Sequence, residues 1–123
     1  MARVTGLGGV FFKVADPAAT RAWYAEHLGV AIDDYGASFA PDPDPKALTI
    51  WSPFKADTDY FGAGPQDFMI NFRVDDLDAL LAALADQGIA CVGEPMDESY
   101  GKFGWIIDCD GRKIELWEPK TPV

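Results

Sequence analysis

The stretch INFRVDDLDALLAALADQGI, residues Ile70–Ile89, decides the fold because an earlier stretch of the chain repeats its pattern. The earlier copy is VFFKVADPAATRAWYAEHLGV, residues Val10–Val30. A second, shorter match lies at the end of each copy, since LTIWSP at residues 48–53 matches IELWEP at residues 114–119. Two copies of one supersecondary unit predict a pseudo-symmetric body, in which the space between equivalent strands is the natural place for a ligand.

Each copy predicts a strand, a helix and then three further short strands. The runs 9–14 and 68–74 alternate apolar residues as half-buried strands do. Asp16 and Asp76 end these runs and are suited to cap the helices that follow. The later strands are predicted at 30–33, 37–40 and 47–51 in the first copy, and at 89–93, 103–108 and 113–117 in the second.

The predicted fold class is therefore α+β in a single domain, residues 1–123. Two βαβββ units, 7–53 and 68–119, are expected to form a curved mixed sheet or partial barrel with pseudo-two-fold symmetry and the helices outside. Residues 54–66 connect the units and are predicted to be a mobile loop, because they are rich in Gly and Asp.

Charge and composition narrow the class of partner. The chain has 20 acidic and 10 basic residues, a formal net charge of -10. Nucleic acid and anionic membranes would repel such a surface, so neither is expected as a partner. The sequence lacks the long apolar run of a signal peptide or a membrane span, which makes the cytoplasm the expected location.

Alternation along the strands predicts which side chains face away from the helices. That face combines large aromatics with a carboxylate and two cations, which suits a cup that holds a flat or amphipathic small molecule. The predicted ligand-binding residues are Phe11, Lys13, Thr49, Trp51, Met69, Asn71, Arg73, Trp117 and, on a loop expected over the cup, Tyr100, while Glu115 is the candidate catalytic group. Alternatively, Glu115 pairs with Lys13 or Arg73 while the aromatics fill a small barrel.

Four motifs give the chain a family resemblance. They are GGVFFKVADP at 8–17, Trp23-Tyr24 through Leu28-Gly29, NFRVDDL at 71–77 and DGRKIELW at 110–117. The chain resembles the vicinal oxygen chelate superfamily, which contains glyoxalases, bleomycin resistance proteins and extradiol dioxygenases. The resemblance implies the paired βαβββ fold, and it implies a homodimer because members commonly dimerise.

The resemblance also implies where a divalent metal would bind in a catalytic member. Its ligands come from the first and last strands of each unit, and the internal alignment puts Gly9, Thr49, Met69 and Glu115 at those positions. Only Glu115 is a good ligand for a hard metal ion, and one carboxylate is too few for a tight site. We therefore expect a member that lacks most metal ligands and has no cofactor, in which Glu115 is the one plausible metal ligand.

Three functions stay open at this level. The first is a metal-free binding protein for a small aromatic or carboxylate-bearing molecule, with aromatic side chains for stacking and Lys13 and Arg73 for an anionic group. The second is an enzyme of lyase, isomerase or dioxygenase type that uses Glu115 as general base or metal ligand. The third is a partner of another protein, with Trp23 or Tyr60 exposed at an interface.

Overall fold

The second copy of the repeat forms most of the regular structure in a computed structural model that describes residues 2–64 and 66–120. Within those residues, two helices and four strands occur. In chain order they are α1 (Pro17–Leu28), β1 (Ile70–Arg73), α2 (Leu77–Asp86), β2 (Met96–Glu98), β3 (Gly101–Ile107) and β4 (Lys113–Pro119).

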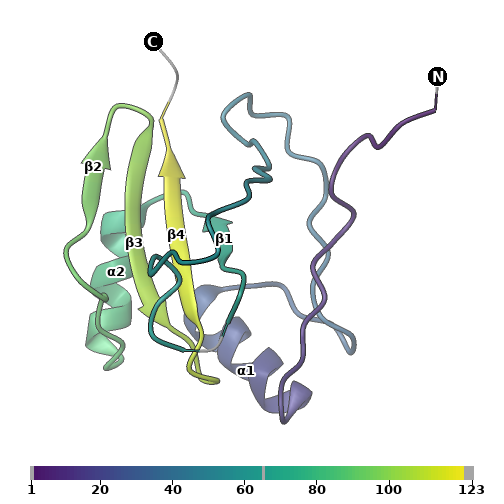
Figure 1. Ribbon diagram of the computed structural model, residues 1–123. Coiled ribbons are helices and arrows are strands. Elements are labelled where there is room, and N and C mark those ends of the chain that lie inside the picture. Colours follow the sequence, from purple (N-terminus) through teal and green to yellow (C-terminus); the bar gives the residue numbers. More distant parts are fainter. Residues whose placement is uncertain (1, 65, 121–123) are drawn as a thin grey trace.

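The strands form one open, mixed sheet with the order β1-β4-β3-β2. β1 pairs with β4 in parallel, while β3 pairs with β4 and β2 with β3 in antiparallel fashion. Both helices lie behind the sheet as it is viewed in Figure 1, and the teal connection that precedes β1 passes in front. The predicted α+β class with helices outside is confirmed, and the sheet is open rather than closed.

The helices begin where the sequence predicts. Asp16 accepts a hydrogen bond from the backbone N–H of Ala19 at 3.1 Å, and Asp76 accepts one from Ala79 at 3.1 Å, as helix N-caps do. The end of β4 adds a second cap to α2, since Glu118 Oε1 accepts from the Leu77 N–H at 2.8 Å. The α2 helix is thereby tied to the strand that carries the candidate site.

The core lies between the helices and the sheet. Its fully buried side chains come from α2, β3 and β4, and they are Leu77, Leu84, Ile106, Ile114 and Leu116. The α1 helix adds Tyr24, whose hydroxyl donates to Asp108 at 2.6 Å and whose ring lies 6.1 Å from that of Phe72. The helix of the first copy thus packs on the sheet of the second.

Only part of the strand prediction is confirmed. The run 89–93 is not a strand, because Gly93 adopts a left-handed φ of 72°. The Val92 N–H donates to the Trp105 carbonyl of β3, whereas the Ile89 N–H donates back to the Leu84 carbonyl of α2. The four strands predicted in the first copy are likewise absent from the described structure, where Ile32 and Ala37 form an isolated bridge. A strand needs a hydrogen-bonded neighbour along its length, and the bridge between Ile32 and Ala37 is too short to supply one.

Candidate ligand-binding site

Two rows of side chains cross the face of the sheet that the helices leave free, which we call the open face. The first row is Asn71, Glu115 and Trp105, from β1, β4 and β3. The second row is Arg73, Trp117 and Phe103, from the same three strands. Strand alternation predicts this face correctly for β1 and β4, since the intervening residues of β4 are buried against the helices.

Glu115 is a buried carboxylate at the centre of the open face, with 9% of its surface exposed. Its Oε1 accepts hydrogen bonds from the Tyr60 hydroxyl and from Trp105 Nε1, the latter at 3.2 Å. Its Oε2 accepts from Asn71 Nδ2 at 2.6 Å. A buried charge requires such partners, and here three neutral donors supply them.

The alternative in which Glu115 pairs with a cation is wrong. The ion pairs formed within residues 2–64 and 66–120 do not include Glu115. The Arg73 guanidinium instead donates to the carbonyl of Leu48. The Lys13 side chain is exposed, and its carbonyl accepts from Arg112 Nη2 at 3.2 Å.

Tyr60 completes the environment of Glu115, and sequence reasoning assigned it to a surface. It belongs to a segment, Phe54–Phe61, that crosses the open face and that we call the strap. Its ring stacks on Phe54 at 5.6 Å and meets Trp105 edge-on at 6.1 Å, and Lys113 Nζ lies 5.0 Å from its centre. Burial and the hydrogen bond to Glu115 raise the pKa of Tyr60 far above its usual value, so its hydroxyl stays a donor.

Trp117 lies beside this cluster in a second aromatic group. Its ring stacks on Phe103 at 6.2 Å with the planes nearly parallel, and Tyr100 lies 5.6 Å from Phe103. The indole Nε1 is buried and has no hydrogen-bond partner among the residues described. The ring lies directly over Gly101, where an added Cβ would overlap the indole. A glycine is therefore required at this position.

The predicted site residues fall into two groups. Asn71, Arg73, Glu115 and Trp117 share the open face, and Tyr100 reaches it through Phe103. The residues of the first copy do not join them, since Phe11 is 97% and Trp51 is 80% exposed. The three that remain are Lys13 and Thr49, which are exposed, and Met69, which is half-buried just before β1.

Trp105 was missed although a signal for it exists. The turn Asp110-Gly111 predicts a hairpin, and the three-residue loop 109–111 that the observed register implies places residue 105 opposite residue 115, whereas a two-residue loop would place residue 106 there. Tyr60 has no comparable signal, because the strap lies outside the repeat and its position depends on tertiary folding.

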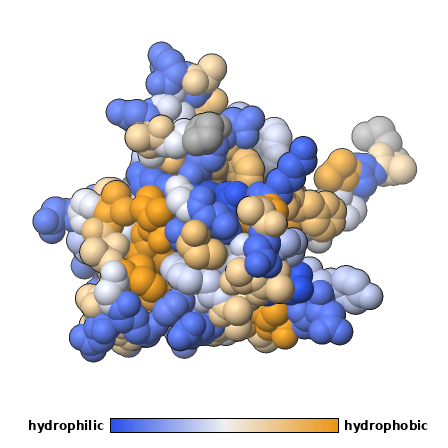
Figure 2. Space-filling view, turned by 90° about the horizontal axis from the view of Figure 1, so that it is seen from below, coloured by the Kyte–Doolittle hydropathy of each residue, from blue (hydrophilic) through white to orange (hydrophobic). Residues whose placement is uncertain are grey.

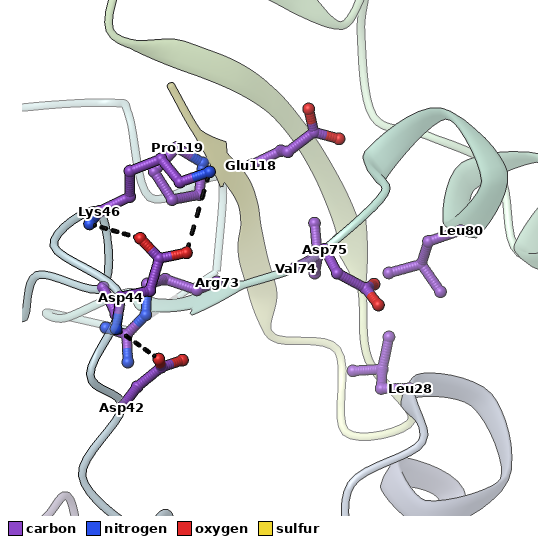
Figure 3. Close-up of a pocket in the computed structure, with 11 residues that line it drawn as sticks. Leu28, Asp42, Asp44, Lys46, Arg73, Val74, Asp75, Leu80, Glu118 and Pro119 are labelled. Atoms are coloured by element: carbon purple, nitrogen blue, oxygen red, sulfur yellow. Dashed lines mark hydrogen bonds and ion pairs between the residues drawn. The ribbon is translucent and has the colours of Figure 1, made fainter. Parts of the chain in front are cut away.

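A cavity of about 570 Å³ opens at the free edge of β1 rather than over Glu115. Figure 3 shows its rim, where Asp44 pairs with Lys46 at 3.8 Å, and its apolar floor, to which Leu28, Val74 and Leu80 contribute. The other residues that line it are Asp42, Ala47, Arg73, Asp75, Glu118 and Pro119. Arg73 lines this cavity and also belongs to the second row of the open face. Glu115 lies apart from the cavity, under the strap.

Comparison with known proteins identifies the family. The model of the Glyoxalase/Bleomycin resistance protein/Dioxygenase superfamily matches residues 6–116. The chain belongs to this superfamily. No curated protein matches the chain.

Solved structures of other proteins share the fold. TnmS3, an antibiotic binding protein from Streptomyces sp. CB03234, is 27% identical over 87% of this chain and 89% of its own, with a TM-score of 0.54. A glyoxylase/bleomycin resistance protein/dioxygenase domain from Frankia sp. EAN1pec is 15% identical over 96% of this chain and all of its own, with a TM-score of 0.58. An integron cassette protein from V. cholerae is 17% identical, covers 96% and 98%, and has a TM-score of 0.63.

The donor set around Glu115 does not fit the divalent metal that the superfamily resemblance implies. A metal ion needs electron-pair donors, but the indole of Trp105 and the amide of Asn71 present N–H groups to the carboxylate. The Tyr60 hydroxyl is also a donor here, and its raised pKa disfavours a phenolate ligand. Across residues 2–64 and 66–120, no three His, Cys, Asp or Glu side chains gather as a possible metal group.

The helices carry no membrane signal. In the part of the chain that the structure describes, neither α1 nor α2 combines the length and the apolar character needed to cross a bilayer.

Proposed function

We propose that this superfamily member binds a small aromatic molecule on the open face of the sheet and does so without a divalent metal. The observation that carries the proposal is the buried Glu115 carboxylate, which is enclosed by aromatic rings and hydrogen-bonded by neutral donors alone. A carboxylate in such surroundings orients a polar ligand group, while the rings supply apolar contact area. The description of the Streptomyces relative as an antibiotic binding protein supports this class of function.

The second row of the open face suits the rest of such a ligand. Phe103 and Trp117 offer stacked aromatic surface beside Glu115. Arg73 lies at the end of this row and its side chain is exposed, so its guanidinium is positioned to meet a carboxylate on the ligand. A ligand that spans the two rows would place a hydrogen-bond donor at Glu115 and an anionic group at Arg73.

Calorimetric titration with a panel of aromatic compounds, with and without carboxylates, tests this proposal. We expect saturable binding to the wild-type protein and affinity about tenfold lower in Trp117→Leu. Trp23→Phe is the matched control, because Trp23 lies on α1 against Tyr24 and His27, behind the sheet. Equal losses in both variants, or no binding to any compound, would contradict the proposal.

Metal analysis of the purified protein tests the second part. We expect no stoichiometric divalent ion and no change in ligand affinity after treatment with a chelator. One bound ion per chain that disappears in Glu115→Gln would overturn the metal-free proposal.

An enzyme that uses Glu115 as a general base is the competing function. Glu115 Oε1 already accepts two hydrogen bonds and Oε2 accepts one, so a substrate proton would have to reach the remaining lone pair of Oε2 or displace Tyr60. We favour binding because the Streptomyces relative of 27% identity is described as an antibiotic binding protein. Turnover of a carbonyl compound that is lost in Glu115→Gln, while the fold survives, would favour the enzyme instead.

We also propose that the chain forms a homodimer. Large apolar side chains of the first copy are exposed to an extent that is unusual for a monomer in water, and they include Val10, Phe11, Phe39, Leu48, Ile50 and Trp51. Burial against a second copy would remove them from water. Sedimentation velocity is expected to give about 27 kDa, twice the chain mass of 13.4 kDa; a monomer at all concentrations would contradict this.

A further inference from the structure

The phenol of Tyr60 lies over Glu115 and makes a hydrogen bond, aromatic contacts and a cation–π contact, which are the kinds of contact that can hold an aromatic ligand. Its hydroxyl donates to the buried carboxylate, its ring stacks on Phe54, and the edge of the ring meets Trp105. The ammonium of Lys113 lies 5.0 Å from the ring centre, on the face where a cation is attracted to an aromatic ring. The ring is thus held by stacking, by a cation and by one charged hydrogen bond.

The strap that carries Tyr60 is held to the sheet at few points. Of the hydrogen bonds among the described residues, two join strap and sheet, and both belong to Tyr60. One is the bond to Glu115, and the other runs from Lys113 Nζ to the Tyr60 carbonyl at 2.7 Å. The middle of the strap, residues 55–57, is exposed. Loss of the Tyr60 contacts with Glu115 and Lys113 therefore removes both hydrogen bonds between the strap and the sheet.

We propose that the natural ligand is an aromatic molecule with a ring hydroxyl, and that it binds over Glu115 by displacing Tyr60. This inference rests on the proposed function, because it names the ligand class for the same open face. Tyr60 acts as an internal competitor for the ligand. The apparent affinity is therefore the intrinsic affinity multiplied by the fraction of molecules in which the strap is open. It is a specificity-determining residue, since only a ligand that reproduces its contacts competes well.

The requirement for a hydroxyl follows from Glu115. If Tyr60 leaves and nothing replaces its donor, a buried carboxylate loses one of its three hydrogen bonds, which is costly. A neutral O–H restores that bond, whereas a ligand carboxylate in the same place would be repelled by Glu115. Any anionic group on the ligand must therefore point along the face toward Arg73.

Binding of 4-methylphenol, which has the structure of a tyrosine side chain, tests the inference against toluene, which lacks the hydroxyl. We expect the affinity of Tyr60→Phe for 4-methylphenol to exceed that of the wild type about tenfold, because the internal competitor loses its charged hydrogen bond. Tyr60→Ala should gain at least as much. Tyr35→Phe is the control, since Tyr35 is 96% exposed and its affinity should equal that of the wild type.

Two further readouts separate displacement from an unrelated effect. In the wild type, 4-methylphenol should speed tryptic cleavage after Lys55, in the strap, and leave cleavage after Lys46, outside it, unchanged. The preference for 4-methylphenol over toluene should disappear in the double variant Tyr60→Phe/Glu115→Gln. Unchanged or weaker 4-methylphenol binding in Tyr60→Phe, or no effect on cleavage after Lys55, would overturn the inference.

The outcomes distinguish this inference from the proposed function. If aromatic compounds bind and Trp117→Leu weakens them, but neither a hydroxyl nor Tyr60 matters, the inference fails and the proposed function stands. If no aromatic compound binds to the wild type or to either Tyr60 variant, both fail. Thermal unfolding of Tyr60→Phe, which keeps the ring, should remain cooperative. If Tyr60→Ala alone fails to fold, the binding data for Tyr60→Phe still decide the test.

Discussion

The closing segments of the two repeats have nearly the same sequence pattern but opposite environments. In the second copy, Ile114 is 0% and Leu116 is 1% exposed, because β4 lies between two strands and under the helices. In the first copy, the equivalent Leu48 and Ile50 are 55% and 62% exposed. The difference teaches that an alternating apolar pattern predicts the capacity to form a strand, whereas burial depends on a neighbouring surface that only the second copy has within the described chain.

The largest expected effect is the difference in lost stability between equivalent core-pattern substitutions in the two copies. Leu116→Ala should lower the free energy of unfolding by about 2–5 kcal/mol, because it opens a cavity in the packed core. The equivalent Ile50→Ala should change it by no more than about 0.5 kcal/mol at concentrations where the chain is monomeric. Urea unfolding measures both. Equal losses would mean that the first copy is packed as tightly as the second.

Two glycines, one from each copy, sharpen the comparison. Gly101 has a φ of 156° and lies against the Trp117 ring, whereas Gly36 has a φ of 150° and no heavy atom near its missing Cβ. Gly101→Ala should therefore cost about 1–3 kcal/mol more than Gly36→Ala, since only the former adds overlap to the backbone strain. Chemical denaturation of the two variants gives the difference. A similar loss in both would show that the Trp117 ring moves aside freely.

The equivalent pair Asn71 and Phe11 tests whether the open face is assembled by the second copy. Asn71→Ala should lower stability by about 1–3 kcal/mol, because Glu115 would lose a donor to Oε2 while it stays buried. Phe11→Ala should lie within about 0.5 kcal/mol, since that side chain is 97% exposed. Thermal unfolding of dilute protein compares them, and a larger loss for Phe11→Ala would break the proposed asymmetry.

The smallest expected effect is a loss of stability in alkali. Burial, together with the hydrogen bond to Glu115, raises the pKa of Tyr60 in the folded protein above the value of about 10 for an unfolded tyrosine. The folded state then holds its proton more tightly, so the stabilisation is complete below pH 10 or so and is lost as the pH rises further. Tyr60→Phe should flatten this decline in unfolding experiments between pH 9 and about 11. An unchanged slope would contradict the assigned environment.

The sequence predicts the second copy well because its signals are local. The cap at Asp76, the leucines of α2 and the Asp110-Gly111 turn act within a few residues, and β4 carries Glu115 and Trp117 on the face that alternation predicts. Two kinds of feature could not be obtained in this way. The strands of the first copy depend on pairing, and the contact of Tyr60 with Glu115 joins residues 55 positions apart through a segment that has no counterpart in the repeat.

The most direct test of ligand binding on the open face is the response of the four tryptophan indole N–H signals in an NMR titration with a hydroxyl-bearing aromatic compound. Trp105 and Trp117 line the open face, whereas Trp23 packs on α1 and Trp51 is exposed in the first copy. The account predicts saturable shifts for Trp105 and Trp117 together with little change for the other two. Shifts at Trp23 or Trp51, with Trp105 and Trp117 unmoved, would contradict it.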